Sequence, residues 1–369
     1  SVSFKRSPRM TYDLHIIKRF LMGYLLLTGG LIIFFVVLHY VEYIDDFMDR
    51  GATMKEVFFV YYPNYIPEIV RLTSPLALFI SAVFLTGRLS QKLEIASLQT
   101  AGVSLYRLLL PFVLVGVFVT GFMFWFNGWI VPQTNRTRIA FEQDYTKDAA
   151  SGAEYANIHR QNSPGSIISV NFYERNSKTA TAVTFQSYTK DGVMVERIDA
   201  DRMTWIDSLS VWRLLNPVIV SFQEDGQFER REVVRLDTTL SIRPRDLART
   251  SGDVEAMTIG EARDYLDTLK RTGANRIGQS LVTYYGKYSY PFANFILILL
   301  AVPLASVRRK GGQAVQLGIG LFIAFVYLAL MKLIEPFGYA DTITPITAAW
   351  LPHILFLIFA GLVLWRVPK

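Results

Sequence analysis

Two pairs of opposite charges lie within or beside stretches that are otherwise apolar. Glu68 and Arg71 are three residues apart, and Lys332 and Glu335 repeat that spacing. Residues three apart share one face of a helix, so each pair can form an ion pair. Two interpretations are open. The opposite charges could neutralise each other near a membrane interface, with the Lys332 side chain extending to water. Alternatively, both pairs could line a polar cavity that contacts an anionic substrate.

Motifs for catalysis or nucleotide binding are missing from the sequence. It has no G-x-x-x-x-G-K-[ST] phosphate loop, no H-E-x-x-H and no G-x-S-x-G, and "GIG" at 318–320 lacks the third glycine of a dinucleotide fingerprint. Cysteine is absent, and the four histidines are scattered along the chain. We therefore expect no catalytic residue, no metal site and no cofactor bound by this chain. Any work against a gradient would draw its energy from a partner or from an ion path.

Long apolar runs dominate the rest of the chain, which has 369 residues and is 51% hydrophobic. A window of about 20 apolar residues is enough to cross a bilayer. We predict a multi-pass membrane protein with six transmembrane helices, at Phe20–Tyr40, Val57–Thr86, Leu108–Trp129, Tyr288–Val307, Ala314–Met331 and Ile346–Trp365. Only the second contains charged residues, Glu68 and Arg71, together with Pro63, Pro67 and Pro75.

Basic residues are unevenly distributed over the segments that join these spans. If the N-terminus is cytoplasmic, the inner segments carry 13 Lys and Arg, against 3 in the short outer loops. This bias predicts that both termini are cytoplasmic. Topology and lipid headgroups explain the net charge of +7, so the sequence does not favour a nucleic-acid partner.

Residues 132–280, between the third and fourth spans, change to short alternating runs such as "TAVTFQSYTKDGVMVERI". Asp191-Gly192 and Asp225-Gly226 are typical of hairpin turns. We predict an antiparallel β sandwich or jelly roll on the outer side of the membrane. The membrane part then comprises 1–131 with helices 1–3 and 281–369 with helices 4–6.

One amphipathic helix is expected near the end of this insert, at 258–272. Thr258 and Glu261 form a capping box, and an apolar stripe follows at Ala262, Tyr265, Leu266 and Leu269. Its apolar face should pack on the insert or lie on the bilayer surface.

The segment "RLSQKLEIASLQTAGVSLYRLLLP", 88–111, places a polar helix at 88–102 between the second and third spans. Its basic residues could hold it to the cytoplasmic leaflet. A mixed polar and apolar face favours docking onto a cytoplasmic protein instead. The residues expected at that contact are Arg88, Gln91, Lys92, Glu94, Ile95 and Leu98.

This segment resembles the signature of the lipopolysaccharide export permeases, the LptF/LptG family. Further matches are "MTYDLHIIKRFL" near the start, "YPFANFILILLAVPLA" followed by "RRKGG", and "PITAAWLPHILFLIFAGLVLWR" at the end. Together with the plan of three spans, a β domain and three spans, the resemblance covers essentially the whole chain.

The resemblance implies a subunit of an ABC transporter in the inner membrane of a Gram-negative bacterium. Two such permeases, an LptF and an LptG, pair around a cavity and bind a dimeric ATPase, LptB, which uses ATP and Mg. Lipopolysaccharide would enter through lateral gates at the first and fifth spans and pass through the β domains to the bridge proteins LptC and LptA.

The resemblance also implies roles for particular residues. Glu94 aligns with a glutamate that contacts the ATPase. Arg136 and Arg138 match a region that meets lipid phosphates, although they could simply begin the domain linker, and Lys332 is a further candidate for phosphate contact. Residues expected to line the cavity are Phe34, Phe35, Glu68, Arg71 and Phe325.

Two departures affect the expected headgroup recognition. The chain has "YYGKYSYP" entering the fourth span, and the outer end of its first span is acidic. A permease for another lipid or lipoprotein, and a membrane sensor or scaffold with a ligand-binding β domain, therefore stay as alternatives. The sequence does not distinguish an LptF-like from an LptG-like role.

Overall fold

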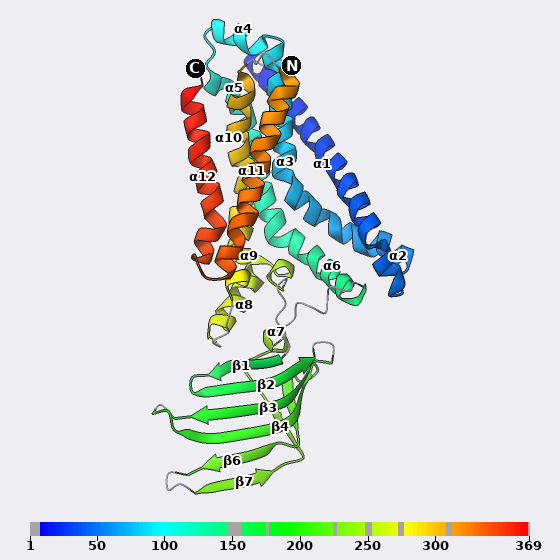
Figure 1. The fold of residues 1–369 in the computed structure, drawn as a ribbon, viewed down its shortest axis with the longest axis vertical. Coiled ribbons are helices and arrows are strands. Elements are labelled where there is room, and N and C mark those ends of the chain that lie inside the picture. Colours follow the sequence, from blue (N-terminus) through cyan, green and yellow to red (C-terminus); the bar gives the residue numbers. More distant parts are fainter. Residues whose placement is uncertain are drawn as a thin grey trace, which may run out of the picture. The chain divides into compact units, whose positions relative to one another are not determined.

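The computed structural model describes residues 8–145, 156–174, 177–189, 191–223, 227–247, 253–271, 277–307 and 312–367. The chain divides into two compact units. One contains Ser1–Lys147, Glu255–Ile259 and Leu281–Lys369, and the other contains Asp148–Val254 and Gly260–Ser280. The first is a helical bundle and the second is built mainly on a β sheet (Figure 1).

The bundle unit contains long helices joined by short turns. Its elements are α1 (Pro8–Asp49), α2 (Met54–Glu56), η1 (Val57–Tyr61), α3 (Tyr62–Gln91), α4 (Glu94–Thr100), α5 (Leu105–Trp125), η2 (Phe126–Ile130), α6 (Val131–Tyr145), α9 (Gly278–Ser289), α10 (Phe292–Ser306), α11 (Gly312–Tyr339) and α12 (Pro345–Arg366). The η1 and η2 segments are π-helical turns that continue into α3 and α6.

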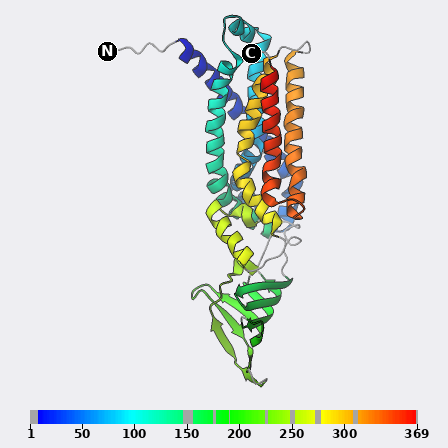
Figure 2. The same ribbon diagram turned by 90° about the vertical axis from the view of Figure 1, so that its left-hand side faces the viewer.

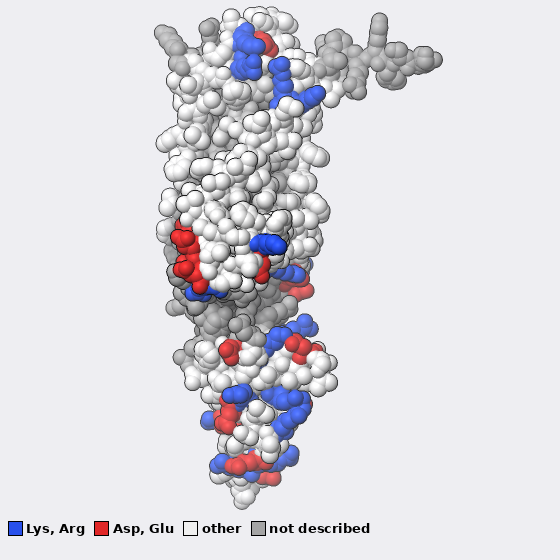
Figure 3. Space-filling model, turned by 90° about the vertical axis from the view of Figure 1, so that its right-hand side faces the viewer, with Lys and Arg blue, Asp and Glu red and all other residues white. Residues whose placement is uncertain are grey.

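Among the described residues, five continuous helical stretches are long and apolar enough to cross a membrane: Tyr12–Asp49, Met54–Gln91, Leu105–Glu142, Gly312–Tyr339 and Pro345–Arg366. The pair α9 and α10 is bent by 52° and makes a sixth if it counts as one span. Figure 3 shows that Lys, Arg, Asp and Glu on the visible face of the bundle gather toward its two ends. The predicted membrane plan is thus confirmed, with the fourth span bent.

α10 is the central helix of the bundle. Ten of its 15 residues are buried, and it packs against α3, α5 and α12. The views in Figures 1 and 2 show these helices running side by side. By contrast, only 11% of the most apolar window of α1 is buried. Within this chain, α1 is therefore a peripheral helix.

The two ends of the bundle differ in what they carry. The start of α1, the end of α12 and the short helix α4 lie at one end, and α2, α6 and α9 lie at the other (Figure 1). We refer to these as the α4 end and the α6 end.

In the described part of the β unit, eight antiparallel strands form one hydrogen-bonded sheet, with the order β1-β2-β3-β4-β5-β8, and β6 and β7 branching from β4. The strands are β1 (Ala156–Ser163), β2 (Ser166–Glu174), β3 (Thr179–Tyr188), β4 (Met194–Ile206), β5 (Val211–Leu215), β6 (Val218–Phe222), β7 (Phe228–Glu232) and β8 (Arg235–Thr238). β4 pairs with β6 along its first half and with β5 along its second half. The predicted antiparallel β domain between the third and fourth spans is confirmed.

Alternation along the strands places one set of apolar residues in a buried core. Trp212 is fully buried there, and its indole N–H donates to the carbonyl of Ile242 at 2.8 Å. Gly192, with φ of +81°, lies in the turn between β3 and β4. The other expected turn, Asp225-Gly226, lies outside the described residues.

Three short helical elements follow the sheet: α7 (Pro244–Leu247), the 3-10 turn η4 (Asp253–Ala256) and α8 (Ile259–Arg271). The predicted stripe of α8, Ala262, Tyr265, Leu266 and Leu269, is buried. The hydroxyl of Tyr265 donates to Asp253 at 3.4 Å, which joins α8 to the residue at which η4 begins.

Candidate functional site

The segment expected to form one helix at 88–102 is interrupted. α3 continues to Gln91, Leu93 adopts a left-handed conformation with φ of 59°, and α4 begins at Glu94. Arg88 and Gln91 therefore belong to the last turn of a membrane span rather than to α4. The break lets both Leu89, before it, and Ile95, after it, pack in the apolar core of the bundle.

α4 thus combines an anchored face with an accessible one. Ile95 is buried and Leu98 packs against the core, whereas Lys92 is exposed and Glu94 is partly exposed. Glu94 lies in the first turn of α4, where a carboxylate is favoured by the helix dipole. Of the six predicted contact residues, three present charge near the surface: Arg88 at the end of α3, Lys92 just after it, and Glu94 at the start of α4.

A cavity of about 550 Å³ lies beside α4. Leu98 of α4 lines it together with Tyr12, Asp13 and Ile16 of α1 and the start of α5. On this cavity, Arg107 donates two hydrogen bonds to Asp13, at 3.0 and 2.6 Å. The paired geometry of guanidinium and carboxylate makes this contact directional. It joins the beginning of α1 to the beginning of α5.

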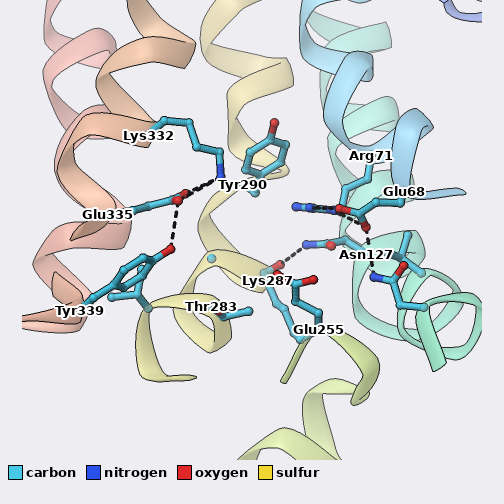
Figure 4. Close-up of a pocket in the computed structure, with 14 residues that line it drawn as sticks. Glu68, Arg71, Asn127, Glu255, Thr283, Lys287, Tyr290, Lys332, Glu335 and Tyr339 are labelled. Carbon is cyan, nitrogen blue, oxygen red and sulfur yellow. Dashed lines mark hydrogen bonds and ion pairs between the residues drawn. The ribbon is translucent and has the colours of Figure 1, made fainter. Parts of the chain in front are cut away.

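At the α6 end, a small polar pocket of about 100 Å³ brings together both charged pairs of the sequence (Figure 4). On one wall, the Arg71 guanidinium binds the Glu68 carboxylate through two contacts. Asn135 donates a further hydrogen bond to Glu68 at 3.1 Å. Glu68 is only 6% exposed, so these donors replace the water that a carboxylate otherwise requires.

The opposite wall comes from α11. Lys332 donates to both carboxylate oxygens of Glu335, at 3.0 and 2.9 Å, and the hydroxyl of Tyr339 donates to the same group at 3.2 Å. In Figure 4 these side chains face those of Glu68 and Arg71 across the pocket. The Lys332 side chain is 64% exposed, so its ammonium group remains in contact with the surroundings.

The base of the pocket was not foreseen from the sequence. Lys287 of α9 is only 5% exposed, and its carbonyl accepts a hydrogen bond from Asn127 at 3.1 Å. The Glu255 side chain is partly exposed, but burial raises the pKa of its carboxyl group and the nearby Glu68 acts in the same direction. A signal for Lys287 existed: it is the single charge in "YYGKYSYP".

The pocket is polar without being strongly basic. Three cationic residues, Arg71, Lys287 and Lys332, are accompanied by three acidic ones, Glu68, Glu255 and Glu335. Both predicted pairs are ion pairs, and both also line one cavity, so the two interpretations of the sequence do not exclude each other. Such a site can hold water or a polar headgroup, with the exposed Lys332 as its most available cation.

Arg136 and Arg138 lie on α6 next to the segment at 255–259. Arg136 is exposed and its Nε donates to the carbonyl of Ala256 at 2.8 Å. Arg138 lies 3.7 Å from Glu142 and 3.6 Å from Glu255. These contacts attach α6 to the segment that precedes α8, which is the positional role considered above. Contact with a lipid phosphate stays a prediction for both residues.

The aromatic residues expected to line a cavity are on the outside of the bundle. Phe34 and Phe325 are exposed on α1 and α11, and Phe35 is partly exposed. They belong to apolar surfaces of the two helices, and the described part of this chain does not enclose them. A cavity bounded by these residues would need lipid or a second subunit as its other wall.

Comparison with known proteins assigns nearly the whole chain to one family. The profile of the lipopolysaccharide export system permease LptF/LptG matches residues 14–366. The LptG permease protein of Haemophilus influenzae is 19% identical over 344 residues, which are 88% of this chain and 91% of that protein. The LptG of Escherichia coli K12 is 20% identical over 315 residues, or 82% of this chain and 83% of that protein. Its described residues contain five apolar spans, or six if the bent pair α9 and α10 counts as one, together with an inserted antiparallel sheet. The chain belongs to the LptF/LptG family of lipopolysaccharide export system permeases.

Proposed function

We propose that this chain extracts lipopolysaccharide from the inner membrane as one of two paired permease subunits, driven by a separate ATPase. The observation that carries the proposal is the family match over residues 14–366. In addition, the chain has a membrane bundle and a β domain, and its sequence contains no nucleotide-binding motif.

α4 is the element proposed to receive the force. It is short, anchored through Ile95, and presents Glu94 beside Lys92. Because one face of α4 is fixed in the bundle and another is accessible, a force that a partner applies to the accessible face would pass to the membrane helices. The ATPase dimer, LptB, would bind this face, with ATP and Mg held entirely by that partner.

The apolar faces of α1 and α11 are proposed to meet the lipid and the paired permease. Phe34, Phe35 and Phe325 would contact acyl chains, while Lys332, Arg136 and Arg138 would lie near phosphates. Extraction exposes many methylene groups, each worth about 0.8 kcal/mol of burial. A cavity between two permeases would rehouse these chains and keep the cost within reach of ATP hydrolysis.

The membrane orientation follows from charge. The α4 end and both termini would be cytoplasmic, since the segments assigned to that side hold 13 Lys and Arg against 3 in the short loops of the other. The β domain would then be periplasmic and pass lipid to the bridge proteins LptC and LptA.

Affinity purification from the native membrane tests the proposal directly. The expected co-purified components are a second permease, an ATPase and lipopolysaccharide. Glu94→Lys should abolish ATPase binding and export while the protein still inserts, because it reverses the charge at the proposed contact. Glu42→Lys makes the same change on the exposed far end of α1 and should leave ATPase binding intact. Normal ATPase capture and export by the Glu94→Lys protein would reject α4 as the contact, and a different lipid class in the complex would reject the substrate.

A further inference from the structure

The far end of α1 is held by a cluster of aromatic side chains. Its buried members include Phe47, Tyr61, Tyr62 and Phe141, which come from α1, η1, α3 and α6. His39 of α1 lies among these rings and stacks on Tyr61, with ring centroids 5.3 Å apart. Because α1 is otherwise little buried within this chain, this cluster is a principal attachment of its second half.

The Tyr61 hydroxyl joins α1 to α6 within this cluster. It donates to Glu142 Oε1 at 2.7 Å. A hydroxyl has one hydrogen to donate, so the Nε2 of His39, 3.1 Å from the same oxygen, must be the donor in that contact. The Nδ1 of His39 is buried without a hydrogen-bond partner among the described residues. The direction of both hydrogen bonds is thereby fixed.

The contacts continue from Glu142 to the segment at 255–259. Glu142 pairs with Arg138, whose guanidinium lies over the Tyr65 ring and pairs with Glu255. Arg136 and Ala256 add a second attachment of that segment to α6. The segment also packs on η2, which continues into α6: an added Cβ on Gly128 would lie 2.8 Å from the Cδ1 of Ile259. The segment is thus firmly fixed to α6, and α6 is connected to α1 through Tyr61.

We propose that Tyr61 is a positioning residue whose hydroxyl, set between His39 and Glu142, makes the second half of α1 and the 255–259 segment move as one body. This segment leads directly into α8 along the chain. The inference rests on the proposed function in one respect: during lipid transfer, a displacement of α1 would reach the connection to the β domain through this contact.

The chain itself offers a matched pair of variants. Tyr61→Phe keeps the buried ring and removes both hydrogen bonds. Tyr62→Phe makes the same change one residue later, where the buried hydroxyl has no hydrogen-bond partner among the described residues. Loss of a hydrogen bond to a charged group shifts an equilibrium by roughly tenfold or more. Only Tyr61→Phe should increase the detached population of α1 by such a factor.

Distance measurements between two spin labels test this on the full-length protein in lipid nanodiscs. The chain contains no cysteine, so Val41→Cys on the exposed face of α1 and Met257→Cys supply the two labelling sites without further changes. We expect Tyr61→Phe to add a second, longer distance and Tyr62→Phe to leave the distribution unchanged. Identical distributions in the two variants would overturn the proposal.

A second variant guards against misfolding. If Tyr61→Phe does not fold, Glu142→Gln takes its place, because it weakens the link between Tyr61 and Arg138. It too should broaden the distribution of spin-label distances. A distribution equal to that of the wild type would again overturn the proposal. The measurement requires neither ATP nor lipopolysaccharide. A changed distance with no effect on lipid export would therefore support the mechanical link while removing its role in transport.

Discussion

Arg71→Gln should destabilise the bundle strongly, because it leaves a buried carboxylate without its main partner. Glu68 is 6% exposed and is bound by Arg71 and Asn135. Removing one member of a buried ion pair typically costs about 3–5 kcal/mol. For a domain of about 150–250 residues, each kcal/mol lost from the free energy of unfolding lowers the thermal midpoint by about 2–4 °C. We therefore expect a decrease on the order of 10 °C in the thermal midpoint of the bundle.

The second charged pair supplies the control. Lys332 and Glu335 have the same three-residue spacing, but the lysine side chain is 64% exposed. Breaking an exposed pair costs at most about 1 kcal/mol, so Lys332→Gln should change the midpoint by only a few degrees. The double variant Glu68→Gln/Arg71→Gln should recover most of the loss, because no buried charge remains.

Intrinsic tryptophan fluorescence, recorded on purified protein in nanodiscs heated at one fixed rate, gives the thermal midpoint. It is measured for the wild type, Arg71→Gln, Lys332→Gln and the double variant. The reasoning would be refuted if Arg71→Gln unfolded within the range of Lys332→Gln. That result would mean that water or lipid headgroups reach Glu68 and solvate its charge.

Three further predictions concern other contacts. Asp13→Arg and Arg107→Asp should each weaken the attachment of α1 to α5, and the variant that carries both changes should restore it. A double-mutant cycle based on the thermal midpoints should give a coupling energy of about 1 kcal/mol, because the pair is partly exposed. Trp212→Ala should destabilise the β domain by about 3–5 kcal/mol, since the ring is fully buried, and limited proteolysis should detect the loss. Replacing Arg136 and Arg138 together by Glu should reduce co-purified lipopolysaccharide, measured by mass spectrometry.

Each of these predictions has its own contrary outcome. Equal midpoints for the Asp13 and Arg107 variants, alone and combined, would show that the pair contributes nothing. Trp205→Ala is the comparison for Trp212→Ala, because Trp205 is only partly buried; equal protease sensitivity would show that burial does not set the cost. Unchanged lipid in the Arg136 and Arg138 variant would remove both residues from the lipid site.

The membrane spans were predictable because an uncharged run of about 20 residues has few alternatives to a transmembrane helix. The antiparallel domain was predictable from alternation and turns for a similar reason. The bend between α9 and α10 was not, although Pro291 marks it: a proline within an apolar run can also continue a span with a mild kink.

Local breaks and tertiary neighbours lay beyond the sequence. Leu93 is not a residue expected in the left-handed region, so the division of 88–102 into the end of α3 and α4 had no local signal. The spacing of Glu68 and Arg71 indicated their ion pair, but nothing in it indicated that Lys287 and Glu255, distant in the chain, would share their pocket. Similarly, Tyr61 gave no sign of its link to His39.

The bend at the start of α10 has an electrical consequence. α10 has 15 residues, and at 1.5 Å per residue it is about 22 Å long, compared with about 30 Å for a bilayer's hydrocarbon core. Lys287 and Tyr290, just before α10, line the polar pocket, so the pocket lies at the end of an apolar helix that is shorter than the hydrocarbon core. With water in the pocket, the transmembrane voltage would fall mainly along α10, and a charged group resting in the pocket would already have crossed part of the dielectric barrier.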